Sequence, residues 1–237
     1  MCGRYTLTTP KQILKEAFDL TDVQSLVQLS KPRFNIAPTQ NVVVIANRPP
    51  EAGRQVEFFR WGLIPFWAKD MKIGSSLINA RSETVAEKPS FRAALTRRRC
   101  LVLADAFYEW RAAPAGEKGK IPTCIRMKSH APFAFAGLWE TWTDPAANST
   151  EGAAGSDVHS CTILTTAPNP LLAEIHDRMP VILRKDQYSA WLDPREKKAD
   201  ELRDLIASYP GGEMETFPVS KLVNSPGNDQ AECVNPA

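Results

Sequence analysis

The chain has 237 residues, of which 43% are hydrophobic and 24% are charged, and its formal net charge is +2. These values are ordinary for a globular protein, and no stretch approaches the ~20 consecutive apolar residues that span a bilayer. The N-terminus lacks a basic segment followed by an apolar one, the pattern of a secretory signal peptide. We expect a cytosolic protein, or a nuclear one in a eukaryote.

Short runs rich in Val, Ile, Phe and Trp dominate the chain and predict strands, because Gly, Pro and Asn interrupt them at short intervals. These runs cover residues 41–46, 56–61, 100–104, 123–127, 133–138, 161–165 and 181–183. Helical patterns are fewer and cover 10–18 (with Thr9 as N-cap), 88–97, 186–192 and 195–209, the last being the clearest. Strands and helices do not alternate regularly. The pattern therefore predicts an α+β fold on a curved, mostly antiparallel, barrel-like sheet with flanking helices.

Two segments have the composition of surface loops. Residues 112–120 carry Pro, Gly and charges, and residues 143–157 form a small-residue run that cannot pack a core. The second segment could be an interdomain linker, but the strands after it look like partners for earlier strands. We therefore expect a single domain over residues 1–237, with flexible loops at 112–120 and 143–157.

Charge is unevenly distributed along the chain. Residues 1–110 hold 16 Lys and Arg against 10 Asp and Glu, whereas residues 111–237 hold 13 against 17. This asymmetry indicates either a polyanionic partner for the first half or ordinary variation on a solvated surface.

The five cysteines include no close pair, which argues against a disulfide framework and against a zinc site. Cys100, Cys124 and Cys161 lie in apolar runs and are expected to be buried packing residues. Cys2 has no apolar neighbourhood in the sequence, so packing does not explain it.

Cys2 follows the initiator Met and precedes Gly3. Removal of Met1 would leave a thiol and an α-amine on adjacent carbons, and roughly a third of such an amine is neutral near pH 7.5. A 1,2-aminothiol condenses with an aldehyde to an imine and then closes to a five-membered thiazolidine. On this motif alone, a cysteine that merely happens to stand second is the simpler interpretation.

Three further segments carry candidate site residues. Glu109 lies in the apolar aromatic run 107–110, so it is expected either to be paired structurally or to have a pKa raised by desolvation, as general acid–base catalysis requires. Asn79 and Arg81 follow an apolar strand, a placement that suits either a site or a satisfied turn. His176 is the only one of the three histidines in a compact polar cluster.

The run 60–70 places two tryptophans and a proline among cations. Flat aromatic and proline faces beside Arg and Lys suit stacking on unpaired bases, which contributes ~1–3 kcal/mol per base. We expect Trp61, on an apolar strand, in the core, and Trp67, after Pro65 at a turn, on the surface.

In chain order, these and other motifs resemble those of the SRAP (SOS-response-associated peptidase) family, the abasic-site processing proteins. The motifs are Cys2-Gly-Arg, Asn35-x-Ala-Pro38, Trp61-Gly, Asn79-Ala-Arg81, Phe107-Tyr-Glu-Trp110, Ile175-His-Asp-Arg-Met-Pro180, and Val219-Ser with Val223-Asn224. The resemblance implies that Cys2, after Met1 removal, forms a thiazolidine crosslink with the ring-opened abasic deoxyribose in single-stranded DNA. Such a crosslink would shield the lesion during the DNA damage response.

The resemblance also implies which residues act. The implied catalytic residues are Cys2, Asn79, Glu109 and His176, and the implied DNA groove is lined by Arg4, Asn35, Pro38, Trp67, Arg81, Thr165 and Arg178. The implied partner is single-stranded DNA containing abasic sites, including single/double-strand junctions. The expected protein is a monomer, nucleoid-associated if bacterial, that uses no metal and no organic cofactor and binds no membrane.

Two other functions remain open. The first is a thiol peptidase with Cys2 as N-terminal nucleophile, His176 as base and Glu109 as orienter, whose only proteolysis is the removal of Met1. The second is a non-catalytic single-strand binding module that uses the aromatic and basic groove alone. Dependence of Met1 removal on Glu109 favours the first, and equal DNA affinity of wild type and Cys2→Ala without a covalent species favours the second.

Overall fold

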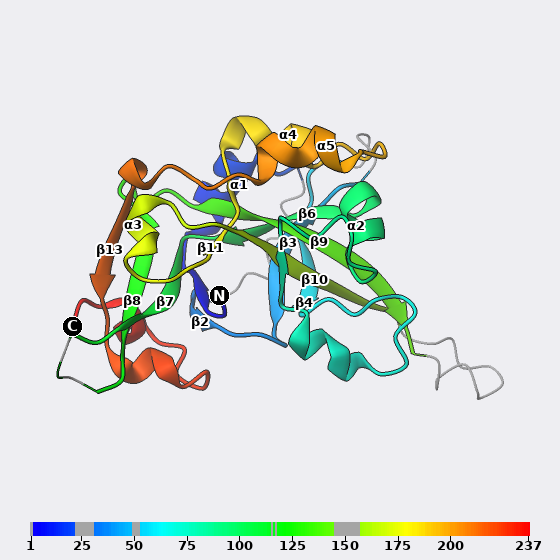
Figure 1. Cartoon of the computed structure of the whole chain (residues 1–237). Helices are drawn as coiled ribbons and strands as arrows, with labels where there is room; N and C mark the ends of the chain where they lie inside the picture. The colour runs from blue at the N-terminus through cyan, green and yellow to red at the C-terminus, as the bar shows by residue number, and fades with distance from the viewer. Residues whose placement is uncertain (1, 22–30, 49–52, 115, 117, 145–156) are drawn as a thin grey trace.

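The computed structural model describes residues 2–21, 31–48, 53–114, 116, 118–144 and 157–237. Two sheets stand side by side in it (Figure 1), and the N-terminal strand is an inner strand of the first sheet. Most of the predicted loop 143–157 falls outside the described residues. The predicted loop 112–120 connects two antiparallel strands of the first sheet.

The first sheet has five strands in the order β13-β8-β7-β1-β2, and every neighbouring pair is antiparallel. Its strands are β1 (Tyr5–Leu7), β2 (Arg33–Ile36), β7 (Ala106–Ala112), β8 (Lys120–Met127) and β13 (Met214–Pro218). The register of β1 against β7 places Tyr5 opposite Phe107, so the residues before Tyr5 run beside those after Phe107.

The second sheet closes into a five-stranded barrel, because β10 pairs with β4 at one side and with β9 at the other. The barrel strands are β3 (Asn41–Ala46), β4 (Glu57–Trp61), β6 (Arg99–Ala104), β9 (Phe133–Thr143) and β10 (Asp157–Thr166), and the short strands β5 (Asn79–Arg81), β11 (Met179–Pro180) and β12 (Ile182–Leu183) extend its edges. Only β4 and β5 run parallel to β10; the other pairs are antiparallel. The predicted α+β fold on a curved, mostly antiparallel, barrel-like sheet is confirmed.

Short helices flank the sheets, with α1, α4 and α5 along one side of the molecule (Figure 1). The α-helices are α1 (Lys11–Phe18), α2 (Arg92–Arg97), α3 (Pro170–Ala173), α4 (Tyr188–Trp191) and α5 (Ala199–Leu202). The 3-10 helices are η3 (Met71–Ser76), η5 (Lys185–Gln187), η6 (Arg203–Ile206), η7 (Gly211–Glu213), η8 (Lys221–Asn224) and η9 (Ala231–Val234). Within the described residues, no helix has the length and apolar character needed to cross a membrane.

Two helix predictions need correction. Thr9 does not cap α1: Pro10 is the N-cap, and the Thr9 hydroxyl donates to Asp105 Oδ2 at 2.9 Å instead. The predicted helix 195–209 is wrong in extent, because helical structure there covers only α5 and η6. Asp193 draws residues 195–197 into a turn, accepting from the Arg195 amide at 3.0 Å and pairing with Lys197 Nζ at 2.9 Å.

Aromatic packing joins the two sheets. Tyr5 of β1 lies edge-on to Trp61 of β4, with ring centroids 5.3 Å apart, and to Phe135 of β9, at 5.7 Å. All three side chains are fully buried. Rings of this size contribute most of the apolar area in such an interface, so β1 is anchored to the barrel as well as to its own sheet.

A buried arginine fixes the outer layer to the barrel. Arg99 of β6 is 0% exposed, and its guanidinium donates only to main-chain carbonyl groups. The acceptors are Trp191 O at 2.8 Å, Leu95 O at 3.0 Å, Thr96 O at 2.6 Å, Arg195 O at 3.1 Å and Asp193 O. One side chain therefore provides hydrogen-bond donors to main-chain carbonyl groups in α2, at the end of α4 and in the segment after α4.

We expect Arg99→Met to lower the free energy of unfolding by about 3–5 kcal/mol, because it leaves several buried carbonyl groups without donors. The matched control is Arg97→Met, which removes a 64%-exposed side chain whose partner Glu196 is also exposed. The control should change the free energy of unfolding by less than about 1 kcal/mol. Urea denaturation measures both, and equal effects would contradict this role for Arg99.

Candidate active site

Cys2 is buried where the two sheets meet. Cys2 is 0% exposed and belongs to the main hydrophobic core, although its neighbours in the sequence form no apolar run. The apolar surroundings come from residues distant in sequence. The Tyr108 amide donates to Arg4 O at 2.9 Å, which continues the β1–β7 pairing and sets Glu109 beside the residues that precede Arg4.

Asn79 reaches Cys2 from the barrel. It begins β5, which runs parallel to β10 with Asn79 opposite Ile163. Asn79 Nδ2 donates to Cys2 O at 2.8 Å. Asn79 Oδ1 is buried and has no hydrogen-bond partner in the described part of the chain, so an acceptor at this site is available to a bound hydroxyl group.

Glu109 reaches the same place from the five-stranded sheet. It is 2% exposed, and its burial raises the pKa of the carboxyl to about 7, which is one of the two alternatives expected from the aromatic run around it. Burial raises the pKa of the Cys2 thiol well above its usual range, and the negative charge of Glu109 raises it further. A thiol next to a carboxyl that titrates near neutrality can pass its proton to that carboxyl.

His176 lies in the segment between α3 and β11. The Asn169 side chain accepts from the Leu172 amide at 2.9 Å and starts α3, and the His176 amide donates to Leu172 O at 2.9 Å. Burial lowers the pKa of the His176 ring, so the neutral form dominates near pH 7. The positive charge of Lys120 lowers the pKa of both His176 and Glu109.

Two groups lie within hydrogen-bond reach of His176 Nδ1. The Arg178 amide donates to Nδ1 at 3.0 Å, and Asp177 Oδ1 lies 2.8 Å away. Because Asp177 is 86% exposed, solvent screens its charge, and the Arg178 amide sets the neutral tautomer. The remaining proton is then on Nε2, where it can be donated.

Asn35 and Arg4 form a buried polar unit rather than an open groove wall. Asn35 is 0% exposed, and its Nδ2 donates to Asn228 O at 2.6 Å and Ser225 O at 3.0 Å. Arg4 Nη1 donates to Asn35 Oδ1 at 2.9 Å and Val223 O at 2.6 Å. Asn35 therefore has no surface open to a ligand in this structure, and its side chain holds the Arg4 guanidinium.

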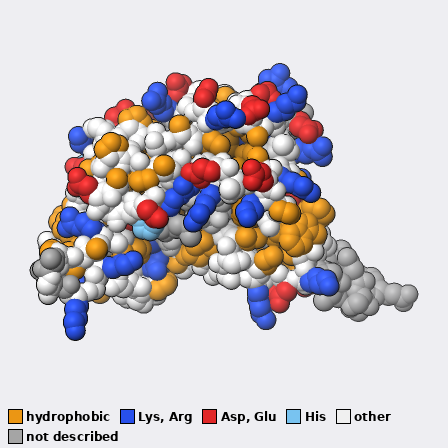
Figure 2. All heavy atoms as spheres, in the orientation of Figure 1, with side chains coloured by type: hydrophobic (Ala, Val, Ile, Leu, Met, Phe, Trp, Pro, Cys, Tyr) orange, Lys and Arg blue, Asp and Glu red, His pale blue; other side chains and the backbone are white. Residues whose placement is uncertain are grey.

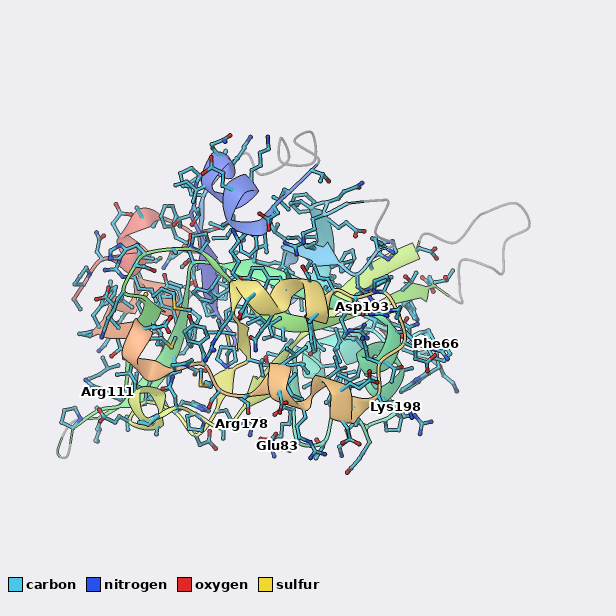
Figure 3. The ribbon with its side chains drawn as sticks, turned by 90° about the horizontal axis from the view of Figure 1, so that it is seen from above. Phe66, Glu83, Arg111, Arg178, Asp193 and Lys198 are labelled. Carbon is cyan, nitrogen blue, oxygen red and sulfur yellow. The ribbon has the colours of Figure 1, made fainter. Side chains whose placement is uncertain are left out.

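Thr165 is likewise beneath the surface. It is 0% exposed, and its carbonyl oxygen accepts from Arg178 Nη2 at 2.6 Å. The Arg178 guanidinium also makes a bidentate ion pair with Glu83, which Figure 3 shows beside it. Arg81, opposite Thr165 in the parallel pairing of β5 with β10, is exposed.

The aromatic predictions agree with the structure, since Trp61 is 0% and Trp67 is 49% exposed. The loop after β4 is closed at its base by Gly62, whose φ is +120° and where a Cβ would lie only 2.5 Å from Gly74 O, so no larger residue fits. Phe66, next to Trp67, is 63% exposed and points away from the molecule (Figure 3). Phe66 was not among the predicted site residues, although its adjacency to Trp67 was a usable signal.

This loop has a small core of its own. Ile64, Ala68 and Trp142 pack together, and Trp142 Nε1 donates to Ala68 O at 2.7 Å. Half-buried Pro38 lies near the loop, because the Thr39 amide donates to Trp61 O at 2.8 Å. Figure 2 shows hydrophobic surface over this segment, next to Lys and Arg side chains gathered in the middle of the same face.

Across the described ranges, no three His, Cys, Asp or Glu side chains are grouped so that they could hold a metal ion.

The fold and site define a protein with a candidate N-terminal-cysteine active site at the edge of a β-barrel. The family model "SOS response associated peptidase (SRAP)" matches residues 1–226, and the chain belongs to this family. The "Abasic site processing protein YoaM" of Bacillus subtilis (strain 168) is 43% identical over 235 residues, covering 99% of this chain and 98% of that protein. The "Abasic site processing protein HMCES" of Rattus norvegicus is 31% identical over 279 residues, covering 100% of this chain and 76% of that protein.

Solved structures agree with the fold. A crystal structure of a protein from Bacteroides thetaiotaomicron is similar with a TM-score of 0.83 and 26% sequence identity, and the match covers 100% of both chains.

The raised pKa of Glu109 has a consequence for stability. Between its ordinary pKa of 4.5 and about 7, the folded protein holds a proton that the unfolded chain has lost, so the free energy of unfolding falls as pH rises through this window. We expect Glu109→Gln to lack this fall and to be more stable than wild type at pH 8, by about 1–3 kcal/mol.

Urea denaturation at pH 5 and pH 8 measures this difference, with Glu87→Gln, at an exposed site, as the matched control. A Glu109→Gln variant less stable than wild type at pH 8 would show that the favourable interactions of the carboxylate outweigh its desolvation, contrary to the direction of the pKa shift.

Proposed function

We propose that this protein captures abasic sites in single-stranded DNA by forming a covalent thiazolidine at Cys2. The observation that carries the proposal is the grouping of three side chains from separate parts of the fold. Asn79 donates to the Cys2 carbonyl, the charge of Glu109 acts on the Cys2 thiol, and the charge of Lys120 acts on both Glu109 and His176. The relatives named above are abasic site processing proteins, which supports the same substrate class.

The chemistry follows from an N-terminal cysteine. Loss of Met1 frees the α-amine, which attacks the aldehyde carbon of the ring-opened deoxyribose to give a carbinolamine. Loss of one water then gives an imine, and the thiol adds to the imine carbon while its proton passes to nitrogen. The net change is one water lost, and neither an oxidant nor a cofactor is required.

Each neighbouring residue has a role that its environment permits. Glu109, with a pKa of about 7, exists in both protonation states near neutrality, so it both protonates the departing hydroxyl and relays the thiol proton to the imine nitrogen. His176 donates from Nε2 to the sugar ring oxygen as the closed sugar opens. Asn79 holds the Cys2 carbonyl and offers Oδ1 to a sugar hydroxyl.

The thiol peptidase is a weaker alternative on these electrostatics. A thiol peptidase needs a thiolate, which a lowered thiol pKa and an imidazolium partner provide. Here burial and Glu109 raise the thiol pKa, and burial lowers the pKa of His176. Both shifts favour a neutral thiol beside a neutral imidazole, which suits an amine that reacts first and a thiol that follows.

The DNA groove is proposed to run from the Trp67 loop to the arginines beside β10. Trp67 and Pro38 offer flat faces to unpaired bases, while Arg81 and Arg178 contact phosphates. Asn35 and Thr165 stabilise this groove from beneath, through Arg4 and Arg178.

Cys2→Ala should abolish the covalent adduct with single-stranded DNA that contains one abasic site, as read by denaturing gel electrophoresis. Cys2→Ser keeps the amine, so its adduct should survive heating only after borohydride reduction. Cys124→Ala, at another buried cysteine away from the site, is the matched control and should crosslink as wild type does. A heat-stable adduct from Cys2→Ala would move the nucleophile to a lysine and contradict the proposal.

Trp67→Ala should weaken binding to undamaged single-stranded DNA by about 5- to 100-fold, the loss of one stacked base, and leave weak duplex binding unchanged. Fluorescence anisotropy measures both affinities, and Met71→Ala, at a 36%-exposed residue close in sequence, is the control. Equal affinity of wild type for single-stranded DNA and duplex would count against the groove.

A further inference from the structure

Arg178 and Glu83 form a two-point ion pair next to the site (Figure 3). Arg178 Nη1 donates to Glu83 Oε1 at 2.6 Å, and Nη2 donates to Oε2 at 2.8 Å. On the barrel side, Nη2 also donates to Thr165 O at 2.6 Å, which fixes the plane of the guanidinium. The two oxygens of one carboxylate therefore occupy the outer edge of a guanidinium that the barrel holds in place.

The two side chains differ in how firmly they are held. Arg178 is 13% exposed, whereas Glu83 is 49% exposed. A half-exposed carboxylate can turn to water with little desolvation penalty, and an ion pair of this exposure adds little to stability. The Arg178 hydrogen bonds lower the pKa of Glu83, so its carboxylate is charged at neutral pH.

The position of the pair connects it to the proposed chemistry. The Arg178 amide donates to His176 Nδ1 at 3.0 Å, so the guanidinium belongs to the segment that carries His176. A backbone phosphate presents two non-bridging oxygens to a guanidinium in the same two-point manner as a carboxylate does. Glu83 thus occupies the place at Arg178 that a phosphate would take.

We propose that Glu83 is an internal competitor for the DNA phosphate at Arg178. In the free protein the Glu83 carboxylate pairs with both terminal nitrogens of the Arg178 guanidinium. When DNA binds, a phosphate of the strand takes this place and the carboxylate turns into solvent. The inference rests on the proposed DNA capture at Cys2, and it assigns Glu83 the role of weakening the hold on strands that carry no lesion. Arg81, exposed and two residues before Glu83, gives the strand a second cation during the exchange.

The test uses labelled single-stranded DNA without an abasic site, so that no covalent step enters, and measures Kd by fluorescence anisotropy at low salt. Glu83→Gln should tighten binding by about 3- to 10-fold, because no carboxylate then competes with the DNA phosphate for the Arg178 guanidinium. Glu87→Gln removes the same charge from an exposed position four residues later and should change Kd by less than about twofold. Glu83→Ala should behave as Glu83→Gln does.

The Arg178→Gln background separates competition from simple charge. There, Glu83→Gln should gain no more affinity than Glu87→Gln does, and an undiminished gain would contradict the inference. Weaker binding by Glu83→Gln in the wild-type background would also contradict it, by showing that Glu83 only positions Arg178. If wild type binds single-stranded DNA but Glu83→Gln and Glu87→Gln change its Kd equally, only the inference about Glu83 fails. If neither wild type nor Glu83→Gln binds single-stranded DNA, the proposed function fails with it.

Discussion

The site depends on the double anchoring of one short N-terminal strand. β1 has only three residues, but it is hydrogen-bonded between β2 and β7 and its Tyr5 ring packs against Trp61 and Phe135 of the barrel. Chain termini usually fray unless a sheet holds them. Here the sheet and the aromatic contact fix the backbone at Tyr5, three residues after Cys2, and so determine where the N-terminal nucleophile lies.

That anchoring also determines the electrostatics. Because the N-terminal segment is inserted between two sheets, Cys2 and Glu109 share one desolvated space, which raises both pKa values. In water at neutral pH, a cysteine thiol would be mostly neutral, whereas a glutamate carboxyl would be fully charged. Burial brings Glu109 to a pKa of about 7, where it can exchange protons in both directions, as imine formation followed by thiol addition requires.

Much of the fold was predictable because the barrel strands β3, β4, β6, β9 and β10 carry long apolar runs that are mostly buried. The strands β1, β2, β5, β7, β11 and β13 were not predicted. Four of them, β1, β2, β5 and β11, have only two to four residues, too few to show a periodicity. Motifs indicated Cys2, Asn79, Glu109 and His176, but the burial of Cys2 and the pairing of Arg178 with Glu83, 95 residues apart, arise only from tertiary packing.

The central claim is that the amine and thiol of residue 2 both bond to the lesion carbon. Intact-mass spectrometry, followed by peptide mapping, of protein mixed with single-stranded DNA containing one abasic site tests this most directly. The account predicts a species with the mass of protein lacking Met1 plus DNA minus one water, with the DNA on the peptide that begins at Cys2. An adduct on a chain that retains Met1, or on a lysine-containing internal peptide, would contradict it.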